Sequence, residues 1–237
     1  MKDITNKIFN SQLALPLSFK TLQNRENFIL SNCNQSAVKL IEKSQSWKIN
    51  TNINSIPAIL IYGPSGCGKT HLSYIFQESN DSLLFSSISS QEIRLAEKNK
   101  SFILDDFCPG INYPSETVMH FLNEVKYNMG SVLLLSKKSA HEMDWGLPDL
   151  NSRLRSLVTC KIELPDDILL YTLIVKYADE KKIILNDKQC IYILDRVERN
   201  FETIIKVIDH LDRFSLEIKE KINFSMINNV ITAIKYE

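Results

Sequence analysis

The sequence lacks a net charge. Its 28 Lys and Arg residues are balanced by 28 Asp and Glu residues. A domain that holds nucleic acid by bulk electrostatics carries a clear excess of positive charge, because neutralising phosphates supplies most of its affinity. We therefore expect any role on DNA to run through protein partners.

Paired cysteines are also missing. The five cysteines are odd in number, far apart and include no C-x-x-C pair, which argues against a zinc site and against a disulfide framework. A reducing compartment fits this pattern best. The residues are Cys33, Cys67, Cys108, Cys160 and Cys190.

Long apolar runs are absent as well. The start, MKDITNKIFN, has no signal-peptide core, and no run approaches the roughly 20 apolar residues of a membrane span. There is no internal repeat or low-complexity segment. We expect a cytoplasmic protein with no membrane partner, and 237 residues suffice for one ordinary domain plus a smaller one.

The most informative stretch is residues 58–70, AILIYGPSGCGKT. A short apolar run is followed by the pattern G-x-x-x-x-G-K-[ST], which is typical of a phosphate-binding loop. Glycines let the backbone N–H groups converge on an anion at the first turn of a helix. The loop residues are Gly63, Pro64, Ser65, Gly66, Cys67, Gly68, Lys69 and Thr70.

Two side chains of this loop predict a nucleotide with Mg²⁺. Lys69 would reach the outer phosphates, and the Thr70 hydroxyl would ligate the magnesium that bridges them. A glycine-rich turn can also be a mere tight connection. The strand before it and the helical segment after it (HLSYIFQES) favour the nucleotide.

A second acidic motif lies downstream. Residues 102–106, FILDD, predict a buried strand ending in two carboxylates. Asp105 would join the magnesium shell, and Asp106 would position the attacking water. Paired aspartates also occur as helix caps or in solvated turns. Their place after a complete phosphate loop favours the catalytic interpretation.

The next strand, Ser131 to Leu135, ends in polar residues. Ser136, Lys137 and Lys138 are candidates for sensing the terminal phosphate, although a lysine pair is more often a solvated strand exit.

Two arginines close the helix predicted within 147–157, LPDLNSRLRSL, where Asp149 or Asn151 would favour its start. Arg153 and Arg155 are either surface charges or a finger that stabilises charge on a neighbour's phosphate. A final buried strand is predicted over residues 158–164.

The alternation of strands and helices predicts an α/β fold, a five-stranded parallel sheet with helices on both faces. From Pro165 the pattern becomes four amphipathic helices, with Asn186 and Asn223 as natural helix starts. We expect a flexible arm over residues 1–20, a nucleotide-binding base over 21–164 and a helical lid over 165–237. The predicted lid helices are 166–182, 187–199, 201–221 and 224–235.

Two apolar segments precede the phosphate loop. Residues 12–17, QLALPL, are either a peptide ligand for a partner or an edge segment on the domain. Residues 28–30, FIL, could line a slot for a base or pack in the core, and they lead into a helix predicted to run to about Trp47.

This order of features resembles the AAA+ ATPases, and more narrowly the DnaA-related proteins of the Hda type, over nearly the whole chain. GKTHL, LDDF, MHFLN and LPDLNSRLRSL are similar to the family's successive motifs, and NFILSNCNQSA to its adenine-side segment. The resemblance makes Arg153 the finger and places His71 at the nucleotide. QLALPL resembles a motif that binds the sliding clamp of the replicative polymerase, through Gln12, Leu13, Leu15, Pro16 and Leu17.

The resemblance implies a regulator that binds ATP or ADP with Mg²⁺. Bound to the clamp, it would appose Arg153 to ATP held by the initiator DnaA and promote its hydrolysis, which prevents re-initiation. Because the sequence ends after the fourth lid helix, we expect no direct sequence-specific DNA binding. Alternatives are a non-hydrolysing adaptor, a helicase-loader-like ATPase and, least favoured, a small-molecule phosphoryl-transfer enzyme. Self-association stays open.

Two departures from the family pattern bear on this chain's own hydrolysis. Residues 136–138, SKK, stand where the family has an acidic or polar sensor followed by arginine. Glu202 stands where the lid should carry a sensor arginine, with Arg199 one turn earlier as the candidate nucleotide contact. We therefore expect weak intrinsic hydrolysis.

Overall fold

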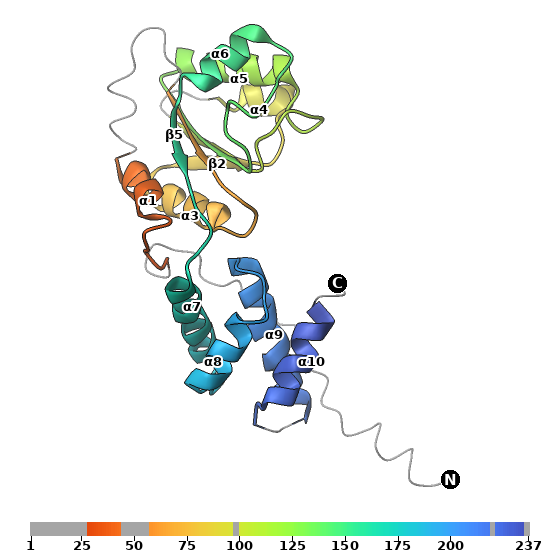
Figure 1. The fold of residues 1–237 in the computed structure, drawn as a ribbon. Coiled ribbons are helices and arrows are strands. Elements are labelled where there is room, and N and C mark those ends of the chain that lie inside the picture. Colours follow the sequence, from red (N-terminus) through yellow and green to blue (C-terminus); the bar gives the residue numbers. More distant parts are fainter. Residues whose placement is uncertain (1–27, 44–56, 97–99, 219–220, 235–237) are drawn as a thin grey trace. The chain divides into compact units, whose positions relative to one another are not determined.

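The computed structural model describes residues 28–43, 57–96, 100–218 and 221–234. These residues belong to two compact units that divide between Leu164 and Pro165 (Figure 1). The proposed clamp motif at residues 12–17 and Trp47 lie outside the described residues.

A five-stranded parallel sheet forms the first unit, as predicted. Its order is β2-β3-β4-β1-β5, and every neighbouring pair is parallel. The strands are β1 (Ala58–Tyr62), β2 (Ser82–Phe85), β3 (Ser101–Leu104), β4 (Ser131–Ser136) and β5 (Val158–Lys161). Since β1 lies between β4 and β5, the chain leaves β1 at a topological switch point, where parallel sheets bind ligands.

Both faces of the sheet are buried, which explains why its central strands are continuous apolar runs. Ala58 and Leu60 of β1 face a core cluster that also contains Phe121 and Leu122. Ile59 and Ile61 face a second cluster on the opposite side of the sheet, with Leu72 and Phe76. Side chains alternate along a strand, so each strand contributes to both clusters.

Helices cover the two faces separately (Figure 1). Helices α1 (Gln35–Glu42) and α3 (Lys69–Ser79) contribute to the second cluster. Helices α5 (Ser115–Tyr127) and α6 (Pro148–Arg155) contribute to the first, and α4 (Ser90–Arg94) packs beside α5. The first unit is therefore a three-layer α/β domain.

The sequence predicts a buried strand over residues 158–164. A strand forms there, but the prediction that it is buried is wrong. Strand β5 ends at Lys161 and is an edge strand, with Val158 58% exposed. Among the described residues only β1 pairs with it, and an edge strand has one neighbour to cover it.

The described residues of the second unit, the lid, form four helices: α7 (Asp167–Glu180), α8 (Asp187–Leu194), α9 (Phe201–Ile218) and α10 (Phe224–Ile234). Both predicted helix starts are confirmed. Asn186 accepts a hydrogen bond from the Gln189 amide in a capping box, and Asn223 accepts one from the Met226 amide. The predicted extension of α8 to Arg199 is wrong, because the helix ends at Leu194 and residues 195–200 form turns and bends.

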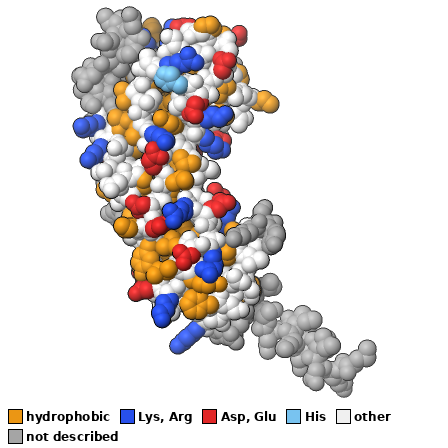
Figure 2. Space-filling model, in the orientation of Figure 1, with side chains coloured by type: hydrophobic (Ala, Val, Ile, Leu, Met, Phe, Trp, Pro, Cys, Tyr) orange, Lys and Arg blue, Asp and Glu red, His pale blue; other side chains and the backbone are white. Residues whose placement is uncertain are grey.

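Charges of both signs are interspersed over the face seen in Figure 2, together with apolar side chains. Within the described part of the chain, no helix is long and apolar enough to cross a membrane.

Candidate functional site

The phosphate loop connects β1 to α3 at the switch point of the sheet. Gly68 precedes α3 with φ of 93° and Gly66 has φ of 69°, values that side-chain-bearing residues rarely adopt. A Cβ at Gly63 would lie 2.5 Å from the carbonyl oxygen of Ile162. The loop therefore requires glycine for backbone conformation and for close approach to the chain beyond β5.

Lys69 is buried inside this loop. Its Nζ donates to the carbonyl oxygens of Gly63, at 2.8 Å, and Pro64, at 2.7 Å. Cys67 is buried beside it, with Sγ 3.7 Å from Nζ. Burial raises the pKa of the Cys67 thiol, opposed by the nearby ammonium of Lys69. The loop thus holds one cation against its own backbone and a neutral thiol at neutral pH.

Thr70 and Asp105 lie together although they are 35 residues apart in sequence. The Thr70 hydroxyl donates to Oδ2 of Asp105 at 3.1 Å. The backbone N–H of Asp105 donates to the carbonyl of Phe85 at 2.9 Å, which fixes the residue at the end of β3. The sequence prediction placed these two side chains in one magnesium shell, and the fold brings them together.

The donor set suits a nucleotide-bound magnesium rather than an all-protein metal site. No group of three or more His, Cys, Asp or Glu residues that could hold a metal occurs among the residues described. One hydroxyl and one carboxylate would leave the other positions to phosphate oxygens and waters, which is how Mg²⁺ is commonly held at phosphates. Thr70 and Asp105 therefore fit Mg²⁺ carried with a nucleotide.

Asp106 has an unusual backbone. Its φ of 51° is in the left-handed region, which aspartate tolerates better than most residues. The next residue is anchored, because the Phe107 amide donates to the Leu135 carbonyl at 2.7 Å. This brings Asp106 beside the end of β4, where its Oδ1 lies 3.1 Å from Nζ of Lys137.

The three candidates at the end of β4 separate in the structure. Ser136 is fully buried and directed inward, since its hydroxyl donates to the Met143 sulfur and accepts from the Lys138 amide. Lys137 pairs with Asp106. Lys138 is exposed and has no ion pair within the described ranges. A buried hydroxyl committed to such contacts is not presented to a phosphate, so Lys137 is the group at this strand end that meets the acidic motif.

Tyr113 was missed by sequence reasoning. Its hydroxyl donates to the carbonyls of Asp105, at 2.6 Å, and Phe85, at 3.1 Å. Burial raises the pKa of this phenol well above its usual value, and the negative charge of Asp105 adds to the shift. The residue supports the backbone beneath the acidic pair, and no local sequence pattern marks such a contact.

Arg153 lies on a different part of the base. Its Nε donates to Asp149 Oδ1 at 3.0 Å, and its Nη1 donates to Asn123 Oδ1 at 2.8 Å. Its Nη2 forms an ion pair with Asp149 Oδ2 at 2.9 Å. Its side chain is 35% exposed. Asp149 is one turn earlier on α6, whereas Asn123 is on α5. The guanidinium is therefore fixed in a plane by both helices.

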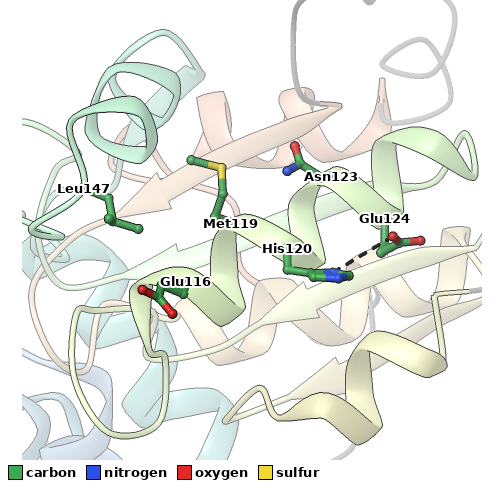
Figure 3. Close-up of a pocket in the computed structure, with 6 residues that line it drawn as sticks. All are labelled: Glu116, Met119, His120, Asn123, Glu124 and Leu147. Atoms are coloured by element: carbon green, nitrogen blue, oxygen red, sulfur yellow. Dashed lines mark ion pairs between the residues drawn. The ribbon is translucent and has the colours of Figure 1, made fainter.

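An open pocket of about 340 Å³ is lined in part by Asn123, the α5 partner of this arginine. Figure 3 shows Met119 and Leu147 directed toward each other across it, and the His120–Glu124 pair farther along α5. Asn123 lines the pocket and also contacts Arg153. The lining residues include none from the phosphate loop, so this is a separate surface.

The apolar segment at residues 28–30 and His71 lie together on the base. Phe28 is buried in the core and its ring meets that of His71 edge to face, with centroids 5.0 Å apart. Leu30 is half exposed. The hypothesis that residues 28–30 pack in the core is correct for Phe28, which also positions His71 on the first turns of α3.

Arg199 belongs to the lid, where its guanidinium pairs with the Asp167 carboxylate at 3.2 Å. Glu202 pairs with Lys206 on α9 at 2.9 Å. Glu202, which stands where the family has an arginine, and Arg199 therefore both form ion pairs within the lid. Arg199 lies outside the helices.

Comparison with known proteins shows which families this chain resembles. Residues 164–231 match the family model described as "Hda, lid domain". The chain is 26% identical over 220 residues to the chromosomal replication initiator protein DnaA of Helicobacter acinonychis, a match that covers 82% of this chain and 48% of that protein. The chain is therefore similar to DnaA/Hda-type AAA+ proteins. It spans about half the length of the DnaA relatives it matches.

Three other proteins resemble this chain over most of its length. An uncharacterized protein of Haemophilus influenzae is 25% identical over 237 residues, covering 94% of this chain and 99% of that one. Domain III of Thermotoga maritima DnaA has the same fold, with a TM-score of 0.71, 16% identity and coverage of 89% and 96% of the two chains. AMPPCP-bound DnaA from Aquifex aeolicus has a TM-score of 0.63 at 21% identity, covering 84% and 69%.

Proposed function

We propose that this replication-initiation-related AAA+ protein is a cytoplasmic negative regulator that stimulates hydrolysis of ATP bound to the initiator DnaA. The observation that carries the proposal is the state of Arg153. It is a partly exposed arginine, held in one plane by Asp149 and Asn123, on a surface separate from the chain's own phosphate loop. A fixed guanidinium away from its own nucleotide suits a phosphate supplied by a partner.

The chain's own loop would bind ATP or ADP with Mg²⁺. Lys69 would exchange its contacts with the Gly63 and Pro64 carbonyls for phosphate oxygens, and Thr70 and Asp105 would hold the cation. The Aquifex aeolicus relative with this fold was solved bound to AMPPCP. Nucleotide released from the purified protein on denaturation, with its phosphate count, tests this assignment.

Tethering to the sliding clamp would run through Gln12, Leu13, Leu15, Pro16 and Leu17. Such an apolar hexapeptide suits binding as an extended peptide. Changing Gln12 and Leu15 to Ala should abolish capture on immobilised clamp, whereas Arg153→Ala should leave it intact. Equal capture of the wild-type protein, the Gln12 and Leu15 variant and Arg153→Ala would contradict a clamp role for this segment.

The stimulation itself is tested with initiator preloaded with ATP, clamp loaded on DNA and this protein. Arg153→Ala should remove the added hydrolysis, a fall on the order of 10³-fold if the arginine acts as a finger. Arg155→Ala is the matched control, because it removes an exposed arginine two residues away on the same helix end. Equal stimulation by wild-type and Arg153→Ala protein would contradict the assignment.

A second candidate is a nucleotide-stabilised adaptor that tethers another partner to the clamp without stimulating hydrolysis. It is favoured by the same contacts of Arg153, since the guanidinium already donates two hydrogen bonds and forms an ion pair with Asp149 within the chain. Clamp capture that survives Arg153→Ala, with no effect of any variant on the initiator's hydrolysis, would identify the adaptor.

A further inference from the structure

The contact between Lys137 and Asp106 concerns the chain's own nucleotide site. The two residues come from neighbouring strands, since β3 and β4 pair in parallel with Leu104 opposite Leu134. The acidic pair follows β3 and the lysine follows β4, so both project from the same edge of the sheet. The Phe107 amide, bonded to the Leu135 carbonyl, keeps these two strand ends in register.

The residue that precedes each partner in sequence is already committed to other contacts. Asp105 accepts from Thr70 and from the Asp106 amide, at 3.1 and 2.9 Å. Ser136 is buried against Met143. Asp106 and Lys137 are both charged and more than half exposed, and they are paired with each other at 3.1 Å.

We propose that Lys137 is a positioning residue that suppresses ATP hydrolysis by this chain, by binding the Asp106 carboxylate that would otherwise orient the attacking water. The proposal rests on the nucleotide site proposed above. In hydrolysis a water oxygen bonds to the terminal phosphorus while the bond to the bridging oxygen breaks. The water must be held in line by an acceptor, and the Lys137 ammonium occupies an oxygen of that acceptor.

The backbone of Asp106 supports this role. Its left-handed φ of 51° and the hydrogen bond from its amide to Asp105 direct the chain toward the β4 end. Both side chains of the pair are more than half exposed, at 58% for Lys137 and 65% for Asp106. An exposed ion pair contributes little to folding and is screened by salt. Removing it should therefore alter hydrolysis without unfolding the protein.

The test measures kcat and KM for phosphate release by the full-length protein with Mg-ATP, without initiator. Lys137→Met should raise kcat about tenfold, a modest share of what a positioned acceptor contributes, with KM within about twofold of wild type. Lys137→Arg keeps the cation and should stay near the wild-type rate. Lys138→Met is the matched control, because Lys138 is adjacent and exposed and lies near Glu142 instead.

The double variant Lys137→Met with Asp106→Asn separates a positioning effect from a general one. If Lys137 acts through Asp106, the double variant shows no rise. A rise that persists in it, or a Lys137→Met rate at or below wild type, overturns the proposal. Wild-type activity should also increase relative to Lys137→Met between about 0.05 and 0.5 M KCl, because salt weakens the pair.

Nucleotide affinity, measured separately with ADP, keeps the two proposals distinguishable. Binding by every variant with no rise for Lys137→Met overturns only this inference. Absence of binding by the wild-type protein overturns the proposed nucleotide site, and this inference with it.

Discussion

Two polar clusters of the base differ in how they are built. The phosphate-loop cluster, which comprises Lys69, Thr70, Asp105, Asp106 and Lys137, is assembled from a loop and the ends of β3 and β4. The Arg153 cluster, which comprises Asn123, Asp149 and Arg153, is assembled on α5 and α6. The first converges at the switch point of the sheet, and the second faces outward from two helices.

The difference suggests a division of labour. Charges in the phosphate-loop cluster contact backbone carbonyls and each other, an arrangement suited to receiving a phosphate and a cation in place. The Arg153 cluster fixes a single cation at a surface bordered by a pocket. One cluster would hold a nucleotide, and the other would act on a nucleotide held elsewhere.

The largest expected effect in the phosphate-loop cluster is that of Lys69→Ala. It removes the loop's cation, and we expect nucleotide affinity to fall about 100-fold, which corresponds to about 2.8 kcal/mol. Titration with a fluorescent ADP analogue measures the change, with Lys188→Ala on the exposed surface of the lid as the control. Unchanged affinity would mean that Lys69 serves only to tie the loop carbonyls together.

Gly63→Ala tests the close approach beneath the same loop. A Cβ there would lie 2.5 Å from the Ile162 carbonyl oxygen, so backbone must move. We expect the free energy of unfolding to fall by about 2 kcal/mol, in the range for overpacking. Urea denaturation checks this, and Ser65→Ala in the exposed part of the loop should change it little. A neutral Gly63→Ala would show that β1 and the chain after β5 can separate without cost.

Much of the phosphate-loop cluster could be predicted from sequence because its spacing has a mechanism. The glycines, Lys69 and Thr70 are fixed by what a phosphate requires, and Asp105 by the strand that delivers it. The sheet followed from apolar runs of strand length, and the starts of α8 and α10 from Asn186 and Asn223.

Other features depend on which surfaces meet in three dimensions. The exposure of β5 depends on its edge position, and the inward direction of Ser136 on Met143. A left-handed glycine commonly follows a helix, but Gly130 after α5 does not adopt that conformation. Instead Met129 has φ of 54°, and Gly130 is required because a Cβ would lie 2.7 Å from the Lys100 carbonyl. No spacing rule contains such contacts.

Tyr113→Phe tests the support beneath the acidic pair. Losing hydrogen bonds to two carbonyls should lower the free energy of unfolding by about 1 kcal/mol. The wild-type phenol has a raised pKa when folded, so its contribution is complete below the unfolded pKa of about 10 and declines as pH rises above it. Urea denaturation measures the difference in free energy of unfolding between wild type and Tyr113→Phe. We expect this difference to be smaller above pH 10 than at pH 8. A larger difference above pH 10 would contradict the assigned contacts.

The smallest expected effect on stability belongs to the Arg153 cluster. Asp149→Asn removes a carboxylate that is 63% exposed, and exposed pairs contribute about 0.5 kcal/mol. Thermal unfolding measures this loss of stability. Asp144→Asn is unsuitable as a control because Asp144 accepts hydrogen bonds from Gly146 and Asn151. Glu202→Gln, which breaks the exposed pair with Lys206, is the matched comparison. If Asp149→Asn lowers the free energy of unfolding by several kcal/mol, the Arg153 cluster serves to stabilise the fold rather than to present Arg153 to a partner.

The central claim is that Arg153 acts on a phosphate bound by another protein. Initiator carrying ATP labelled on the γ-phosphate is mixed with clamp on DNA and with this protein loaded with unlabelled ADP, and labelled phosphate is followed through a single turnover. We predict that wild-type and Arg155→Ala proteins release the label and that Arg153→Ala does not. Release at the same rate with Arg153→Ala, or no release with any of the three, would contradict the account.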